Sequence, residues 1–298
     1  MKRFIILLLI ICMKSADAQE WCIEYYSEQY PKNVLVVGDN SDKYEYFVGN
    51  TIDDKTNDVY PLAICVDEDG NYIERVFEIK GKISWFTNAI GIGKGDVFVT
   101  ALISDDNMVE SYKKLWVAVM NSKLEILCED HIMLNESYST YVGMVHILKN
   151  YDDEVVLLAR VADSDKVDYM FYKFDESCNL LEQSCLENNT NNSEVTDFTT
   201  IPNTRHYAIF GNGLHYSGMS NVNYIDENFN LLSTTFIDDM NNYPDIMLPM
   251  RMSVDYWYDN VFLMSAQSSI TSGINKWRPL VVKMDAEMNI IKTLDLER

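Results

Sequence analysis

Short apolar runs separated by polar turns recur along most of the chain. Five of these runs combine aromatic and β-branched residues, which is typical of strands; they lie at residues 44–50, 96–103, 154–161, 205–211 and 260–266. Beyond residue 18 no segment shows the 3.6-residue period of an amphipathic helix. The pattern therefore predicts an all-β protein.

A polar motif follows each of these runs after about 20–25 residues. Asp or Asn opens the motif, two polar residues and a variable one follow, and Asn or Glu then precedes two apolar residues. The opening residues are 54, 54, 51 and 59 positions apart, at Asp67, Asn121, Asp175, Asp226 and Asp285. An Asp or Asn that caps its own turn between two apolar runs predicts a β-hairpin.

A further apolar or mixed stretch precedes each run by some ten residues, as at residues 85–91 and 141–148. Each period therefore contains four short strands, and a four-stranded antiparallel unit that repeats in this way is typical of a β-propeller blade. Five copies fit the chain, which predicts a β-propeller of about five four-stranded antiparallel blades. Residues 20–32 are left over. They could add a strand to the final blade, or begin an incomplete sixth blade.

Residues 59–77, and residues 96–103 followed by 115–127, carry the most regular copies of the motif. They resemble the bacterial β-propeller repeat proteins whose blades end in an Asp-x-x-Gly-Asn hairpin, often called the seven-bladed β-propeller repeat group. The resemblance covers roughly residues 33–298 and has low motif specificity. It implies a fold and very little chemistry, because one fold supports many functions.

The first 18 residues have the pattern of a secretory signal peptide. Lys2 and Arg3 precede an apolar run at residues 4–12, and Ala16-Asp17-Ala18 supplies a cleavage signal. Ile11 is not the small residue that a lipoprotein signal needs before Cys12. We therefore expect a signal peptide at residues 1–18 and a single propeller domain at residues 19–298. The product would be periplasmic or extracellular and not a lipoprotein.

The charge of the chain excludes some partners. The chain has 24 Lys and Arg against 46 Asp and Glu, a formal charge of −22. Cleavage would remove Lys2, Arg3, Lys14 and Asp17 and leave −24. Such a chain repels nucleic acid. No later apolar run approaches the length of about 20 residues that crosses a membrane, so we expect no membrane insertion.

The cysteines and histidines indicate no cofactor and no metal site. Their spacings match no zinc pattern. Five cysteines lie beyond residue 18, and proximity in sequence favours Cys178 and Cys185 as a disulfide pair. The alternative is that these cysteines are buried thiols.

Candidate binding residues come from fold analogy with propellers. Variable loops are expected at residues 104–114, 162–168, 212–221 and 267–277, with long blade connections as well. Aromatic rings in such loops suit the apolar faces of sugars or a protein surface. The aromatic and histidine candidates are Tyr112, Tyr138, His215, Tyr216, Tyr243 and Trp277. The first strands are expected to line a central channel, where the polar residues are Asn88, His146, Asp197 and Arg251; holding water is their simpler role.

These features favour a secreted, non-enzymatic module that binds an unknown protein or glycan through its variable-loop face. The alternative is a carbohydrate-active enzyme of the five-bladed glycoside hydrolase type. Such an enzyme needs two carboxylates about 5–10 Å apart. Asp197 and Asp255 are the best-placed candidates, but no catalytic motif supports them.

Overall fold

The protein was analysed as a computed structural model that describes sixteen segments of the chain. These are residues 6–9, 22–25, 34–38, 43–52, 56, 58–79, 83–104, 112–134, 138–141, 145–163, 167–186, 195–212, 220–237, 247–255, 260–271 and 274–295. All regular structure in these segments is β-strand. They contain no helix that is long and apolar enough to cross a membrane.

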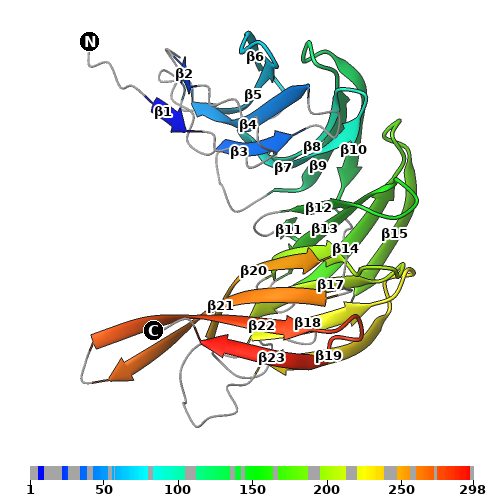
Figure 1. Cartoon of the computed structure of the whole chain (residues 1–298). Coiled ribbons are helices and arrows are strands. Elements are labelled where there is room, and N and C mark those ends of the chain that lie inside the picture. The colour runs from blue at the N-terminus through cyan, green and yellow to red at the C-terminus, as the bar shows by residue number, and fades with distance from the viewer. Residues whose placement is uncertain are drawn as a thin grey trace. The chain divides into compact units, whose positions relative to one another are not determined.

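The strands form five antiparallel four-stranded blades, each a meander in chain order (Figure 1). Blade 1 contains β3 (Val34–Gly38), β4 (Tyr44–Ile52), β5 (Val59–Asp67) and β6 (Tyr72–Val76). Blade 2 contains β7 (Ile83–Gly93), β8 (Asp96–Ser104), β9 (Lys114–Met120) and β10 (Ile126–Met133). One parallel residue pair, Val59 with Ile83, joins blades 1 and 2 into a continuous sheet.

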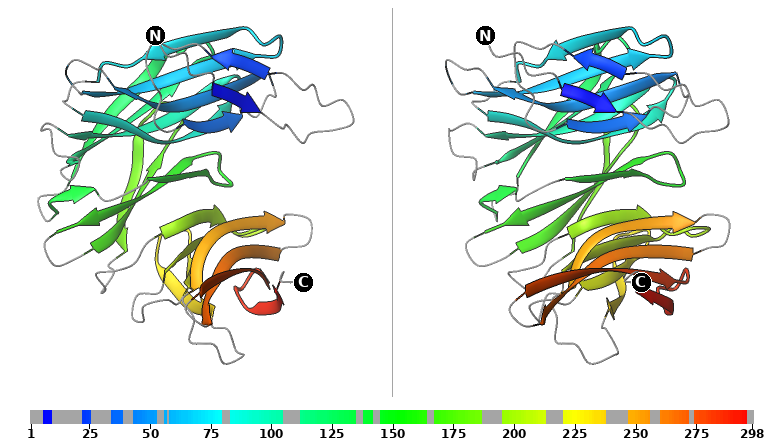
Figure 2. Two further views of the ribbon diagram at one scale, coloured as in Figure 1. Left: turned by 90° about the vertical axis from the view of Figure 1, so that its left-hand side faces the viewer. Right: turned by 60° about the vertical axis from the view of Figure 1, so that its left-hand side comes forward.

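In blade 3 the first strand is divided into two short pieces that both pair with the second strand. The blade contains β11 (Thr140–Tyr141), β12 (His146–Lys149), β13 (Val155–Ala162), β14 (Val167–Phe174) and β15 (Leu180–Leu186). Blade 4 contains β16 (Val195–Thr200), β17 (Tyr207–Asn212), β18 (Ser220–Ile225) and β19 (Leu231–Ile237). Blade 5 contains β20 (Met247–Asp255), β21 (Asn260–Thr271), β22 (Ile274–Met284) and β23 (Ile290–Asp295). Figure 2 shows from two sides that β20 to β23, in orange and red, form one curved sheet. The chain is thus an all-β propeller fold of about five blades, as predicted.

The described part of the left-over segment near the amino end, residues 22–25, does not pair with the last blade. β2 (Cys22–Tyr25) pairs with β1 (Ile6–Leu9) in a separate two-stranded sheet. Blade 5 takes all four of its strands from the carboxyl end of the chain. Of the two alternatives for residues 20–32, the addition of a strand to the final blade is therefore wrong for residues 22–25, the part that the structure describes. Cleavage after residue 18 stays a prediction, because strand pairing does not test it.

The predicted hairpin is confirmed at all five places. In the first copy, the backbone N–H groups of Asp69 and Asn71 donate to Asp67 Oδ1 at 3.0 and 2.8 Å. The Asn71 side chain donates to Asp67 Oδ2 at 3.0 Å. This side-chain hydrogen bond, followed by those from the backbone, holds the pKa of Asp67 below its ordinary value. The same Oδ1 contacts recur at the other four opening residues, Asn121, Asp175, Asp226 and Asp285.

The fourth position of the hairpin has a role that the sequence pattern did not reveal. It always lies in the left-handed region, with φ between 58° and 81°. Only the first copy has glycine there, Gly70. In the later copies a large or medium side chain occupies this strained position and is buried; these residues are Leu124, Cys178, Phe229 and Met288. The later copies are therefore complete turns that also supply core residues.

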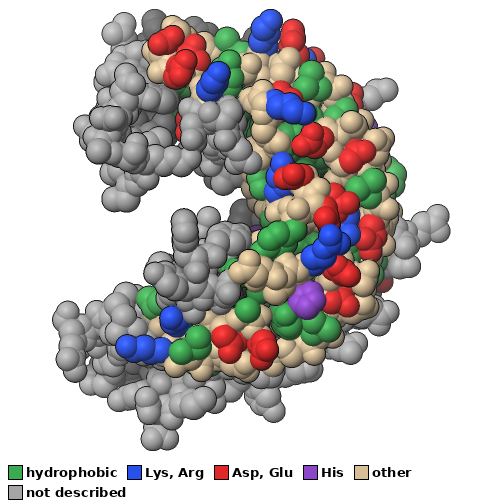
Figure 3. All heavy atoms as spheres, turned by 45° about the vertical axis from the view of Figure 1, so that its right-hand side comes forward, with side chains coloured by type: hydrophobic (Ala, Val, Ile, Leu, Met, Phe, Trp, Pro, Cys, Tyr) green, Lys and Arg blue, Asp and Glu red, His purple; other side chains and the backbone are tan. Residues whose placement is uncertain are grey.

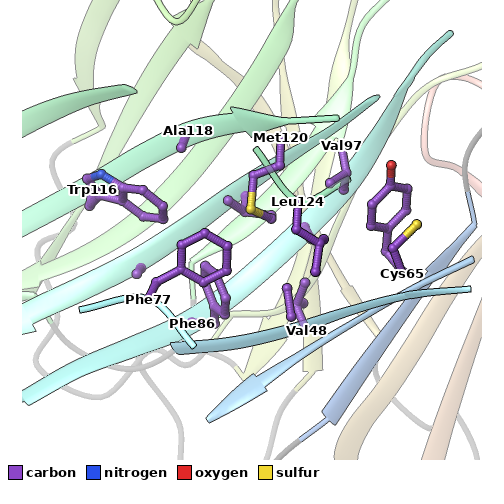
Figure 4. Packing of buried hydrophobic residues seen from close by; sticks show 14 of the residues in the cluster. Val48, Cys65, Phe77, Phe86, Val97, Trp116, Ala118, Met120 and Leu124 are labelled. Atoms are coloured by element: carbon purple, nitrogen blue, oxygen red, sulfur yellow. The ribbon is translucent and has the colours of Figure 1, made fainter. Parts of the chain in front are cut away.

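Leu124 shows how this position joins two blades of the first compact unit, residues 1–109 with 116–129. Its side chain is fully buried beside Met120 of its own blade and Val48 of blade 1 (Figure 4). Its carbonyl oxygen accepts a 2.8 Å hydrogen bond from Arg75 of blade 1. The hairpin of blade 2 is thus attached to blade 1 by both its side chain and its backbone.

The second unit, residues 110–115 with 130–298, has two core clusters of the same design. Between blades 3 and 4, Phe229 packs with Phe171, Phe198 and Tyr207. Between blades 4 and 5, Met288 packs with Ile201 and Phe210. In each cluster the fourth hairpin residue of one blade, Phe229 in blade 4 or Met288 in blade 5, packs against the preceding blade.

The expected disulfide between Cys178 and Cys185 is wrong. Cys178 is disulfide-bonded and so is Cys128, whereas Cys185 and Cys65 carry thiols. Cys178 lies in the hairpin turn, while Cys185 lies on β15 opposite Met170. Five strand residues at about 3.3 Å each separate Cys185 from the start of β15, far more than the ~6 Å between the Cα atoms of a disulfide.

Candidate functional site: a polar hollow between blades 3 and 4

A sixth copy of the Asp/Asn turn joins β12 to β13 in blade 3. Asn150 Oδ1 accepts from the backbone N–H groups of Asp152 and Glu154 at 3.0 and 2.9 Å. The Asn150 side chain donates to Glu154 Oε2 at 2.8 Å, and Asp153 has a φ of 64°. The motif was present in the sequence as Asn-x-x-Asp-Glu. The five-residue repeat of the sequence marks only the third-to-fourth strand hairpins, so its period does not predict this turn.

The exposed face of this turn is attached to the turn between β16 and β17 of blade 4. The Tyr151 hydroxyl donates to the carbonyl of Ile201 at 3.1 Å and accepts from the backbone N–H of Asn203 at 2.7 Å. Arg205 Nη2 lies 3.1 Å from Asp152 Oδ1. These contacts fix the two turns side by side, about fifty residues apart in sequence.

A hollow of about 290 Å³ lies between these turns. The described residues that line it are all polar, charged or tyrosine, namely Asn150, Tyr151, Asp152, Glu154, Lys173, Arg205, Tyr207, Glu227 and Asn228. They come from first-to-second and third-to-fourth strand turns and from the adjoining ends of β14 and β17. The hollow therefore lies at the hairpin end of the blades, and not at the variable-loop end where a site was expected.

Lys173 forms the floor of the hollow. Its side chain is 14% exposed, and Nζ lies 2.8 Å from Glu182 Oε2 and 4.0 Å from Glu154 Oε2. The ammonium group also lies 5.3 Å from the centre of the Phe229 ring. Burial alone would lower the pKa of Lys173, but the hydrogen bond and the charge of Glu182 raise it overall. Lys173 is thus a fixed cation.

Tyr207 closes the inner wall beside Lys173. Its side chain is buried and belongs to the core cluster between blades 3 and 4. Burial raises the pKa of Tyr207, and a hydrogen bond with the Asn150 side chain opposes that effect. The wall therefore presents a neutral phenol.

Arg205 forms the rim of the hollow and is the second cation. Its side chain is 63% exposed and bridges two exposed carboxylates, Asp152 at 3.1 Å and Glu227 at 3.8 Å. Three carboxylates and two cations line the hollow, which leaves one net negative charge. Such a surface can exchange many hydrogen bonds with a hydroxyl-rich ligand. Among the described residues, no group of three His, Cys, Asp or Glu side chains could hold a metal ion.

All four predicted channel residues lie on first strands. Asn88 is on β7, His146 on β12, Asp197 on β16 and Arg251 on β20. Asn88 Oδ1 and Asp197 Oδ1 each accept from the next backbone N–H, at 2.9 and 3.0 Å. Asp255, the second catalytic candidate, is the last residue of β20. A role in a channel or in catalysis stays a prediction for these residues.

The aromatic candidates are dispersed. Tyr112 is 9% exposed and lies in the core, so its ring is not presented on an exposed loop. The half-buried Tyr138 donates its hydroxyl to Asp168 Oδ2 at 2.6 Å. Burial, followed by this hydrogen bond, raises the pKa of Tyr138 far above its ordinary value. Among the described residues, none of the predicted site residues lines the hollow.

The last predicted loop is largely strand. β21 extends to Thr271 and β22 begins at Ile274, so most of residues 267–277 pair in blade 5. Trp277 is part of β22, where its backbone pairs with Ser268. The candidates His215, Tyr216 and Tyr243 lie outside the described residues.

Acidic side chains are spread over the molecular face in Figure 3, with basic and apolar side chains among them. The described surface in this view shows no tract of a single charge. On this face the hollow is therefore distinguished by its shape and polarity, and not by a tract of charge.

No protein-family model matches the chain, and no curated protein is significantly similar to it in sequence. Solved structures share its fold at very low identity. A protein of unknown function from Dyadobacter fermentans is similar with a TM-score of 0.54 and 7% identity, over 91% of this chain and 84% of that chain. The polysaccharide lyase Uly1 has a TM-score of 0.53 and 8% identity, over 95% and 76% of the two chains. Prolyl oligopeptidase B from Galerina marginata has a TM-score of 0.52 and 9% identity, over 88% and 35%. These likenesses concern the fold alone.

Proposed function

We propose that this chain is an exported, non-enzymatic β-propeller that binds a glycan, and that the hollow between blades 3 and 4 is its binding site. The observation that carries the proposal is the lining, which combines an exposed tyrosine ring with eight further hydrogen-bonding side chains in one concavity. The volume is close to the lower limit of about 300 Å³ for small-molecule sites, which suits a single sugar residue.

The arrangement of side chains fits the two surfaces of a sugar ring. Tyr151 is 47% exposed at the rim, and its ring can lie against C–H groups. Asn228 and Asp152 line the same hollow and can exchange hydrogen bonds with hydroxyl groups. Because the Tyr151 hydroxyl is held by Ile201 and Asn203, the ring is positioned before a ligand arrives.

The carboxylates of the hollow favour binding over hydrolysis. Asp152 and Glu227 form salt bridges with Arg205, and Glu154 with Lys173. A glycosidase needs one carboxylic acid that can donate its proton and a second carboxylate facing it across the scissile bond. In the hollow the three carboxylates instead hold Arg205 and Lys173 in place, as suits a binding surface.

Export is supported by two independent features of the chain. The first is the signal-like segment at residues 1–18. The second is that Cys128 and Cys178 are each disulfide-bonded, since disulfides persist in oxidising compartments. The Asp67–Asn71 hairpin, with Gly70 at its fourth position, supports membership of the Asp-x-x-Gly-Asn repeat group.

The test is a glycan array with the exported chain, expressed with its own leader, followed by calorimetry on each hit. Tyr151→Ala should abolish binding to the hit. Tyr72→Ala is the matched control, because Tyr72 is similarly exposed at 44% and lies on β6 of blade 1. A hit that survives Tyr151→Ala but is lost in Trp277→Ala would place the site at the opposite end of the blades. Release of new reducing ends or unsaturated sugars from a hit would show an enzyme instead.

A further inference from the structure

The rim of the hollow contains a charged group that a ligand can replace. Asp152 and Glu227 come from different blades and are joined through one guanidinium group, that of Arg205. All three side chains are well exposed, at 47%, 51% and 63%. Exposed ion pairs of this kind change an equilibrium constant only about 1.4- to 5-fold. An incoming cation can therefore displace Arg205 at small cost.

We infer that the hollow accepts a sugar with a protonated amino group, and that the ligand's ammonium replaces the Arg205 guanidinium between Asp152 and Glu227. The inference rests on the proposed function and names the ligand class for the same site. Hydroxyl groups on the sugar form hydrogen bonds with the amides and phenols of the lining. The ammonium group forms ion pairs with the two rim carboxylates.

The two cations of the hollow differ in a way that supports this assignment. Lys173 is nearly buried, at 14% exposure, and is held by Glu182 and by the face of Phe229. It stays in place when a ligand enters. Arg205 is 63% exposed, so it can turn into solvent at little cost.

The charge that remains after this movement favours a cation. With Arg205 turned away, the charged residues in the described lining are Asp152, Glu154, Glu227 and Lys173, which leaves two net negative charges among them. The formal charge of −22 on the whole chain also raises the local concentration of cationic ligands. An N-acetylated sugar has no such charge, so it can form hydrogen bonds with the rim carboxylates but no ion pair.

The experiment compares two oligosaccharides of equal length, one of glucosamine and one of N-acetylglucosamine, by calorimetry below the pKa of the sugar amine. We expect the amine form to bind more tightly. Arg205→Gln should raise affinity for the amine form by about two- to fivefold, because it removes the internal competitor. Asp152→Asn and Glu227→Gln should lower the affinity for the amine form more than the affinity for the acetylated form, so each of them should reduce the ratio of the two affinities.

Lys123→Gln is the control for overall charge. It also removes one positive charge from an exposed hairpin, but in blade 2, and it should leave both affinities unchanged. Equal affinity for the two oligosaccharides would overturn the inference and leave glycan binding intact. A loss of affinity for the amine form in Arg205→Gln would also overturn it, since Arg205 would then be part of the binding surface. Failure of every glycan on the array would overturn the proposed function and the inference together.

Discussion

The ring of Phe229 lies flat on the ring of Phe171, with 4.5 Å between centroids and 9° between planes. Phe229 belongs to the hairpin of blade 4, and Phe171 to β14 of blade 3. The stack is reached only because Phe229 adopts a φ of 64°. A conformation that L-residues normally avoid is thus maintained by the packing of two blades.

This relationship predicts an unusual order of stability at position 229. Phe229→Ala should cost about 3–5 kcal/mol in the free energy of unfolding, because it empties a buried site. Phe229→Gly loses the same ring but accepts the left-handed conformation, so it should be about 1 kcal/mol more stable than Phe229→Ala. Urea unfolding followed by circular dichroism measures the difference.

Phe210 provides the control for this comparison. It is fully buried in β17, in an ordinary strand conformation. There Phe210→Gly should be about 0.5–1 kcal/mol less stable than Phe210→Ala. If Phe229→Ala were also more stable to unfolding than Phe229→Gly, the positive φ at position 229 would not be a source of strain.

The strands, the period and the capped hairpins followed from local patterns, because alternation and turn chemistry act over a few residues. The opening residues Asp67 and Asp226 could be identified in this way. The role of Phe229 could not, because a side chain at positive φ points in a direction that no strand or helix period encodes. The hollow was equally hidden, since its walls meet through contacts such as Tyr151 with Ile201, fifty residues apart.

The first and fifth positions of the hairpin carry one carboxylate and one amide, and we expect that the two groups can exchange places. Asp175 accepts at Oδ2 from the Asn179 side chain at 2.8 Å, whereas in the second blade Asn121 donates to Glu125 at the same distance. Asp175→Asn alone sets two amides against each other and should cost about 0.5–1.5 kcal/mol.

Adding Asn179→Glu to Asp175→Asn rebuilds the arrangement found in blade 2. The double variant should recover most of the stability, which gives a favourable coupling energy in a double-mutant cycle. Unfolding in urea at neutral pH measures each corner of the cycle. Additive costs would show that positions one and five act separately.

The same hairpins should contribute to acid sensitivity. The side-chain amides of Asn71 and Asn179 hold the pKa values of Asp67 and Asp175 below their ordinary value of 3.8. A carboxylate with a lowered pKa in the folded state contributes stability above its unfolded value, and this is lost as the pH falls through the folded value. Replacing Asp67 and Asp175 by Asn keeps the side-chain oxygen that accepts the backbone hydrogen bonds of each turn. The double variant should therefore lose less unfolding free energy than the unchanged protein as the pH falls below about 4. Urea unfolding at a series of pH values measures this loss. An equally steep loss of unfolding free energy in the double variant and the unchanged protein would contradict the prediction.

The cysteines should react in three separate stages. Cys185 is an exposed thiol on β15, so an alkylating reagent should label it in the native protein. Cys65 is a thiol that is 3% exposed and should react only after unfolding. Cys128 and Cys178 should react only after reduction, and reduction should lower the free energy of unfolding by about 2–4 kcal/mol.

Mass spectrometry of proteolytic peptides assigns each stage. Labelling of Cys178 in the unfolded but unreduced chain would contradict the disulfide, and with it one of the two features that support export.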